Sequence, residues 1–161
     1  MILKLKDGDV EIELFPKIAP YHVERFEKLA NMGMYDGVVF HRVIDGFMAQ
    51  TGDVKFGKTN SPDFNLELAG TGASDLPNLK AEFSDIAHNR GVLSMARSAD
   101  PNSANSQFFI VFESSPHLDR SYSAFGKVIK GMELVDKIKK GEGSGGAVED
   151  PDKIISLRSK K

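Results

Sequence analysis

The chain has 161 residues, of which 40% are hydrophobic and 27% are charged, and it contains no cysteine. This length and composition favour one globular domain over residues 1–161 and exclude a disordered chain, a disulfide framework, a thiolate nucleophile and a cysteine-based zinc site. The formal net charge of −2 gives no electrostatic reason to expect a nucleic-acid partner.

The N-terminal residues carry charges where a secretory signal peptide would need an apolar segment. No apolar run approaches the roughly 18–20 residues that a membrane-spanning helix requires. Together with the lack of cysteine, these features predict a cytoplasmic protein without a membrane partner. Since the sequence gives no sign of an obligate oligomer, we expect a monomer.

Short strands are predicted over residues 2–6 and 10–14, joined by a hairpin turn at Asp7-Gly8, because glycine accepts the positive φ that such turns need. In the second strand, hydrophobic residues at 10, 12 and 14 alternate with glutamates, which indicates one buried face. Pro20 then suits the start of a helix whose residues at 23, 26 and 30 share one face. Residues 31–33 end this helix.

A β-rich block follows over residues 38–53, and glycine and proline mark residues 54–90 as loop. Further strands are predicted over 91–97, 107–112, 122–129 and 154–157. A short amphipathic helix over 132–139 is expected to end at Gly141, before a flexible turn over 141–146. Many short strands with two lone helices favour a mainly β fold, a closed antiparallel barrel with helices over its ends.

The residues of common catalytic and ligand-binding sites lack the required spacing. The serines at 94, 98, 103 and 106 include no G-x-S-x-G motif, and the four histidines show no metal-ligand spacing. The glycine-rich segments 69–72 and 143–146 lack the lysine and hydroxyl residue of a phosphate-binding loop, and we interpret both as ordinary loops. The sequence therefore predicts neither a metal nor a cofactor.

The most informative segment is residues 40–53. With a period of two, Phe40, Arg42 and Ile44 would share one strand face, with further apolar residues and Gln50 nearby. This pattern indicates a fixed guanidinium at the edge of an apolar pocket, although a lone arginine more often bonds a surface carboxylate. In a second segment, Phe108 and Phe109 must point to opposite faces, and the pattern leaves open which one is core.

These two segments resemble the signature motifs of the cyclophilins. Residues 40–53 are similar to the family pattern F-H-R-x-I-x-G-F-M-x-Q-G-G-D, with departures at Asp45 and Thr51. Residues 93–96, 106–110 and 125–128 match later motifs in the same order. The resemblance implies an eight-stranded antiparallel β-barrel capped by two α-helices. It also implies a peptidyl-prolyl cis/trans isomerase that rotates X-Pro bonds and assists protein folding without a cofactor.

Carried over by position, the resemblance makes Arg42 the catalytic arginine and Gln50 the side chain that positions it. The pocket for the proline ring would then be formed by Phe47, Met48, Phe109 and Leu118. Positions expected to contact other parts of the substrate are His41, Ala96, Arg97, Gln107, His117 and Tyr122. The implied partners are proline-containing peptides and unfolded proteins.

Three departures from the family affect ligand preference. His117 stands where many members have a tryptophan that contacts cyclosporin, so we expect only weak cyclosporin binding. Tyr122 replaces a common histidine. Arg97 replaces a common asparagine. It could face the substrate groove, or it could be an ordinary surface residue that points to solvent or pairs with Asp100. The segment 65–82 resembles that of bacterial members.

Two other functions remain open at this stage. The chain could be a proline-peptide binding module or chaperone that has lost turnover, although Arg42 and its neighbours are intact. It could also be a non-catalytic barrel with a ligand in an interior cavity, which sequence alone does not reveal.

Overall fold

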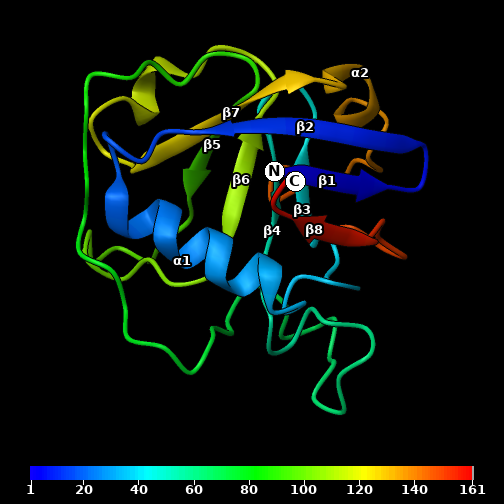
Figure 1. Ribbon diagram of the computed structural model, residues 1–161. Helices are drawn as coiled ribbons and strands as arrows, with labels where there is room; N and C mark the ends of the chain where they lie inside the picture. The colour runs from blue at the N-terminus through cyan, green and yellow to red at the C-terminus, as the bar shows by residue number, and fades with distance from the viewer. Residues whose placement is uncertain (161) are drawn as a thin grey trace.

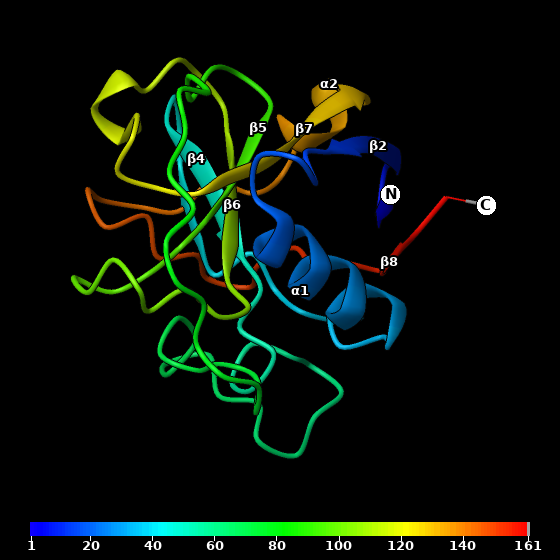
Figure 2. The same ribbon diagram turned by 60° about the vertical axis from the view of Figure 1, so that its left-hand side comes forward.

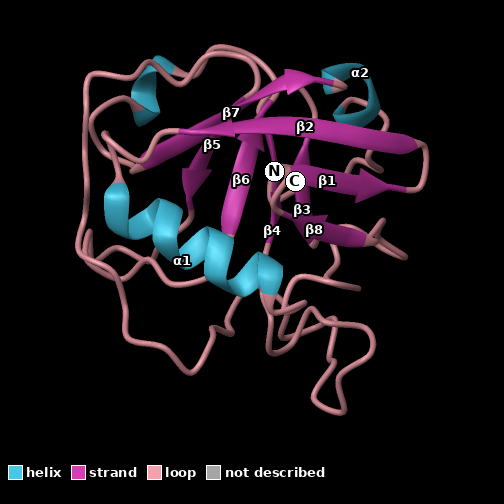
Figure 3. Ribbon diagram, viewed as in Figure 1, coloured by secondary structure: helices cyan, strands magenta, loops and turns pink. Residues whose placement is uncertain are grey.

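The hydrophobic runs of the sequence form one antiparallel sheet of eight strands in the order β3-β4-β6-β5-β7-β2-β1-β8. The computed structural model describes residues 1–160. Figures 1 and 3 show its strands, its helices and the long loops between them. The elements in chain order are β1 (Ile2–Leu5), β2 (Gly8–Leu14), α1 (Pro20–Asn31), β3 (Arg42–Ile44), β4 (Met48–Thr51), β5 (Val92–Met95), β6 (Phe108–Val111), the 3₁₀ helix η1 (Pro116–Leu118), β7 (Ala124–Lys130), α2 (Met132–Val135) and β8 (Ser156–Arg158).

The sheet is curled but open, so the prediction of a closed barrel is wrong. Its end strands are β3 and β8, and within residues 1–160 no strand pairing joins them. Each of these strands has only three residues, too few to form a long run of hydrogen-bonded pairs between them. The irregular segments before them meet instead, where Phe40 N–H donates to the Asp152 carbonyl at 2.8 Å and Ile154 N–H donates to the Val38 carbonyl at 2.9 Å.

The first hairpin forms one residue earlier than predicted. Leu5 pairs with Gly8, so Lys6 and Asp7 make the turn and Gly8 begins β2 with a φ of 146°. The predicted long loop over residues 54–90 is confirmed, since no helix or strand lies within it.

Both predicted helices are present, and Figures 1 and 2 show them at opposite ends of the curled sheet. The second is shorter than predicted, because α2 ends at Val135 and Gly141 is not its cap. Gly141 N–H instead donates to the Val43 carbonyl at 2.8 Å, which draws this part of the chain to β3. Within residues 1–160, no helix combines the length and apolar character needed to cross a membrane.

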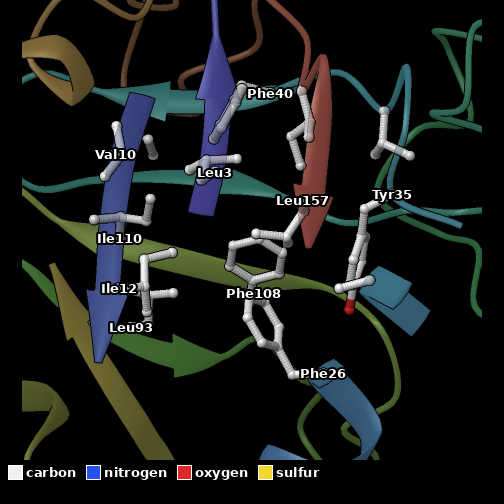
Figure 4. Packing of buried hydrophobic residues seen from close by; sticks show 14 of the residues in the cluster. Leu3, Val10, Ile12, Phe26, Tyr35, Phe40, Leu93, Phe108, Ile110 and Leu157 are labelled. Carbon is white, nitrogen blue, oxygen red and sulfur yellow. The ribbon is translucent and has the colours of Figure 1, made fainter. Parts of the chain in front are cut away.

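Aromatic rings fill the inside of the curled sheet. Phe26 from α1 packs with its ring centroid 5.0 Å from that of Phe108 and 4.9 Å from that of Phe125. Tyr35 joins them, and its hydroxyl donates to the Ser106 carbonyl at 2.7 Å, so its polar atom is paired inside the core. Figure 4 shows Phe26, Tyr35 and Phe108 beside Leu157 from β8. These apolar side chains occupy the interior where a ligand-binding barrel would hold its ligand.

The central strands β4, β5 and β6 are buried on both faces, which explains their continuous hydrophobic runs. One face belongs to the main core. The other carries a second apolar cluster that includes Met48, Phe109 and Leu118. Phe108 lies in the main core and Phe109 in the second cluster, which settles the question that the sequence left open.

Candidate active site

The strand register places the main candidate residues in one row on the outer face of the sheet. Arg42 on β3 is opposite Gln50 on β4, and Gln50 is opposite Phe109 on β6. Ser94 on β5 continues the row beyond Phe109. Because side chains alternate along a strand, these four share one face while Val43, Ala49 and Phe108 point into the core.

A cavity of about 130 Å³ opens beside this row. The apolar residues Phe47, Met48, Phe109 and Leu118 form part of its wall, and Arg42 and Gln50 lie at its edge. The structure thus brings together most of the predicted site residues, and the cavity is lined by Arg42, Phe47, Met48, Gln50, Ala96, Arg97, Phe109, Leu118 and Tyr122.

Two acceptors hold the Arg42 guanidinium. Its Nη1 donates to Gln50 Oε1 at 3.3 Å, and its Nε donates to the Gly145 carbonyl at 3.1 Å. Gln50 is itself fixed, because its Nε2 donates to Gln107 Oε1 at 3.0 Å. Gln107 Nε2 in turn donates to the carbonyls of Gly70 and Gly72, each at 2.9 Å. A chain of hydrogen bonds therefore links the long loop to the arginine.

Phe40 does not share the face of Arg42, contrary to the prediction. It is fully buried in the main core, where Figure 4 shows it near Leu3. The strand begins only at Arg42, so the alternation of a strand does not extend back to residue 40. Ile44, two residues further along β3, shares the face of Arg42 as predicted, and Phe47 lines the same cavity as Arg42. Both Ile44 and Phe47 pack against the second cluster.

Arg97 lies across the rim of the cavity. Its Nη2 and Nε donate to the Ser121 carbonyl at 2.6 and 3.2 Å, and its Nη1 donates to the Ser98 carbonyl at 2.9 Å. The guanidinium lies 4.5 Å above the ring of Tyr122, a cation–π contact. Tyr122 meets Phe109 edge-on at a centroid distance of 5.8 Å, so Arg97 and Tyr122 together support the cavity wall.

A second cavity of about 350 Å³ adjoins the first, and both are lined by Gln50, Ala96 and Arg97. Gln107 faces this larger cavity instead of the apolar one. Amides and hydroxyls form much of its wall, including Asn78, Thr71 and Ser103. An extended peptide could place a ring in the apolar cavity and a neighbouring side chain in the polar one.

Two predicted substrate-binding residues lie outside both cavities. His117 is exposed, and its ring lies 5.3 Å from that of Phe47, at the outer side of the apolar wall. His41 is half-buried, and its Nδ1 has no hydrogen-bond partner among residues 1–160. Burial is the main reason that the pKa of His41 is lowered to about 4. Attraction to Asp53 raises this pKa, and repulsion from Arg42 lowers it further.

Behind Phe109 lies a hydrogen-bonded group that the sequence did not reveal. The His88 ring contacts Asp119 Oδ1 through Nδ1 at 3.0 Å and Ser94 Oγ through Nε2 at 2.9 Å. The order of these three residues matches that of a hydrolytic triad, but Ser94 has no exposed surface and cannot reach a substrate. No short sequence pattern could have shown this group, because Asp119 lies 31 residues from His88 in the chain.

The chemistry available at this site is electrostatic and steric. Among residues 1–160, the side chains that line the apolar cavity include no serine, threonine, cysteine or carboxylate. A permanently charged, planar guanidinium does face it, with its plane held by two acceptors. Such a group can donate a hydrogen bond to a bound peptide whose apolar ring occupies the cavity.

Comparisons with known proteins identify the class of protein. Residues 1–159 match the family described as "Cyclophilin type peptidyl-prolyl cis-trans isomerase/CLD". A probable peptidyl-prolyl cis-trans isomerase from Brucella suis is 58% identical over 156 residues, which cover 96% of this chain and 79% of the relative. Peptidyl-prolyl cis-trans isomerase B from Bacillus subtilis is 40% identical over 139 residues, which cover 86% of this chain and 89% of that protein. The chain belongs to the cyclophilin family of peptidyl-prolyl cis-trans isomerases.

Solved structures agree with this assignment. The cyclophilin AquaCyp293 from Hirschia baltica has a TM-score of 0.78 at 30% identity, covering 96% of this chain and 71% of that one. A Cryptosporidium parvum cyclophilin, whose crystal structure was determined in the presence of the dipeptide Ala-Pro, has a TM-score of 0.77 at 29% identity. That match covers 99% of this chain and 98% of the other.

Proposed function

We propose that Arg42 is the catalytic residue of this isomerase and that the apolar cavity beside it binds the proline ring of the substrate. The observation that carries this proposal is the guanidinium of Arg42, held by Gln50 and Gly145 at the edge of a cavity lined by Phe47, Met48, Phe109 and Leu118.

The proposed mechanism follows from the chemistry of the prolyl bond. Rotation about X-Pro breaks amide resonance, with a barrier of about 18–20 kcal/mol. In the twisted state the prolyl nitrogen becomes pyramidal and regains a lone pair. A guanidinium that donates to this lone pair stabilises the twisted state more than the planar ground state, which lowers the barrier. The apolar wall holds the ring and excludes water that would solvate the planar amide.

The proposed substrates are proline-containing peptides and flexible or unfolded segments of proteins. The cyclophilin studied with Ala-Pro supports this substrate class, because its fold is similar over almost the whole chain. We further propose a monomeric protein that acts in the cytoplasm, on the basis of the sequence features described above.

Replacing Arg42 with alanine tests the proposal directly. The variant should stay folded, because the side chain is exposed at the sheet edge, and kcat/KM should fall by about two to three decades, equivalent to about 3–4 kcal/mol. Circular dichroism and the unfolding midpoint serve as controls for folding. Unchanged activity in a folded variant would remove Arg42 from the mechanism.

Exchange spectroscopy by NMR on a proline peptide distinguishes an isomerase from a binding module. An isomerase produces exchange cross-peaks between the cis and trans resonances at catalytic enzyme concentration, whereas a binding module only broadens the peptide lines. We expect exchange.

A further inference from the structure

The glycine-rich turn over residues 141–147 lies along the edge of β3, immediately beside Arg42. Gly141 N–H donates to the Val43 carbonyl at 2.8 Å, and Val43 N–H donates to the Gly146 carbonyl at 2.9 Å. Val148 N–H donates to the His41 carbonyl at 3.2 Å. Bridges pair Ala147 with both Arg42 and Glu142. The turn is therefore fastened to the strand on both sides, although its tip is exposed.

The tip of this turn supplies one of the two acceptors for the Arg42 guanidinium. Gly145 accepts from Nε and Gln50 accepts from Nη1, so the acceptors lie on different edges of the planar group. One acceptor alone would let the guanidinium swing about that bond. Two acceptors fix its plane and leave the remaining N–H groups available to the cavity that Arg42 lines.

We propose that the turn over residues 141–147 is a positioning element for catalysis, and that the Gly145 carbonyl orients Arg42 toward the prolyl nitrogen. This inference rests on the proposed role of Arg42. It gives a function to a segment in which four of the seven residues are glycine and the group that contacts Arg42 is a backbone carbonyl.

Gly146 sets the position of that carbonyl. Its φ is +71°, and a Cβ atom built there would lie 2.5 Å from Ile44 Cγ1 and 3.1 Å from the Val43 carbonyl. A side chain at 146 must therefore push the turn away from β3, because neither neighbour is the free end of a flexible group. Ser144 is the matched control, since it is an exposed residue of the same turn and its side chain makes no hydrogen bond among residues 1–160.

The first test compares Gly146→Ala with Ser144→Ala in the full-length protein. For Gly146→Ala we expect kcat to fall about tenfold with KM nearly unchanged, because a charge-assisted hydrogen bond that orients the reacting group is lost. Ser144→Ala should keep the wild-type kcat. A folded Gly146→Ala protein with wild-type kcat would overturn the proposal.

A double-mutant cycle with Arg42→Lys separates positioning from general damage to β3. Lysine keeps the charge but has no Nε–H for the Gly145 carbonyl to accept. If the turn acts through that bond, adding Gly146→Ala to Arg42→Lys should cause almost no further loss of kcat. An equal tenfold loss in both backgrounds would mean that the substitution merely distorts the strand, and the proposal would be wrong.

A pair of backbone ester variants, made by semisynthesis, decides the matter if Gly146→Ala does not fold. Glycolate in place of Gly146 turns the Gly145 carbonyl into an ester carbonyl, a weaker acceptor. Glycolate in place of Gly145 weakens the Ser144 carbonyl, which accepts no hydrogen bond among residues 1–160. Each ester also removes the N–H of the replaced glycine, and neither of these N–H groups donates a hydrogen bond among residues 1–160.

In this pair, only the first ester should lower kcat and shift the ¹⁵Nε–¹H resonance of Arg42. Equal activity and equal Arg42 spectra in the two esters would overturn the inference. If Arg42→Ala itself leaves activity intact, the proposed function fails instead, so the two failures are distinguishable.

Discussion

Among residues 1–160, the Arg97 guanidinium contacts backbone carbonyls and an aromatic ring, and it forms no ion pair with an acidic side chain. Its N–H groups donate to the backbone carbonyls of Ser98 and Ser121, and its guanidinium lies over Tyr122. Neither of the simpler alternatives, a side chain free in solvent or a pair with Asp100, describes this arrangement. Since carbonyl oxygens carry only partial charge, the positive charge of Arg97 remains uncompensated beside both cavities.

Arg97 should therefore favour an acidic residue shortly before the substrate proline. For X-Ala-Pro peptides, kcat/KM with X as Glu should exceed that with Gln by a factor of about two to five, since a half-exposed charge contributes up to about 1 kcal/mol. High salt should reduce the preference. Measurement of the Glu, Gln and Lys peptides at two salt concentrations checks this. A flat series, or one that Arg97→Asn leaves unchanged, would contradict it.

His117 should make this protein a weak cyclosporin binder. It is exposed beside Phe47, at the position where many family members carry tryptophan. His117→Trp should strengthen binding about tenfold, because indole buries more apolar area than imidazole and has no acceptor nitrogen to keep solvated. Calorimetric titration of both proteins with cyclosporin provides the measurement. Equal affinity would show that residue 117 does not control drug binding.

The sequence predicted the side chains of the candidate site better than the backbone groups that hold those side chains in place. Arg42, Gln50 and Phe109 could be found because strand alternation and the family motifs both depend on side-chain identity. The Gly145 carbonyl could not, because every residue carries a carbonyl and only the fold decides which one meets Arg42. The same holds for Gly70 and Gly72, which accept from Gln107.

At the scale of elements, α1 begins without a local cap. Ala19 stands at its N-cap position and offers no side-chain acceptor. Glu82, from the long loop, supplies one instead. Its carboxylate accepts from the backbone N–H of His22 at 2.9 Å and of Tyr21 at 3.3 Å, and it also contacts the His22 ring. A negative charge at this place also suits the helix dipole.

Glu82→Ala should destabilise the protein by about 1–2 kcal/mol, the usual cost of losing a helix cap. The first-turn amides of α1 should also exchange with solvent faster. Glu24→Ala is a suitable control, because Glu24 is an exposed residue of the same helix. Chemical unfolding and hydrogen exchange of the three proteins give the comparison. Equal unfolding free energies for both variants would mean that Glu82 contributes nothing as a cap.

Elements set by local pattern were predicted well, and those set by distant contacts were not. The strands and α1 follow from periodicity and turn residues. The length of α2 does not, because Gly141 pairs with Val43 on β3 instead of capping the helix. Likewise, buried Asp53 organises the long loop through the backbone N–H groups of Lys55, Phe56, Gly70 and Gly72. Such contacts connect residues whose positions in the sequence follow no regular spacing.

At the scale of the whole molecule, buried histidines link stability to pH. His22 and His88 have almost no exposed surface, and His41 is half-buried. Burial is the largest influence on each ring, and it lowers the pKa of all three. For His22 and His88, the neighbouring Glu82 and Asp119 partly oppose this effect. All three rings therefore favour the neutral form in the folded protein.

The free energy of unfolding should fall as the pH is lowered from about 6.5 toward 4. In this window the unfolded chain gains a proton at His41 before the folded chain does, and the lowered pKa values of His22 and His88 act in the same direction, so acid favours unfolding. For His41, with a folded-state pKa of about 4 against an ordinary value of 6.5, the loss is about 2 kcal/mol at pH 5 and about 3 kcal/mol at most.

Urea unfolding at half-unit pH steps measures how steeply the free energy of unfolding changes with pH. His41→Asn should flatten this slope, while His117→Asn, a change at an exposed ring, serves as the matched control. A slope that is the same in His41→Asn and in the wild-type protein would show that His41 does not contribute to acid sensitivity.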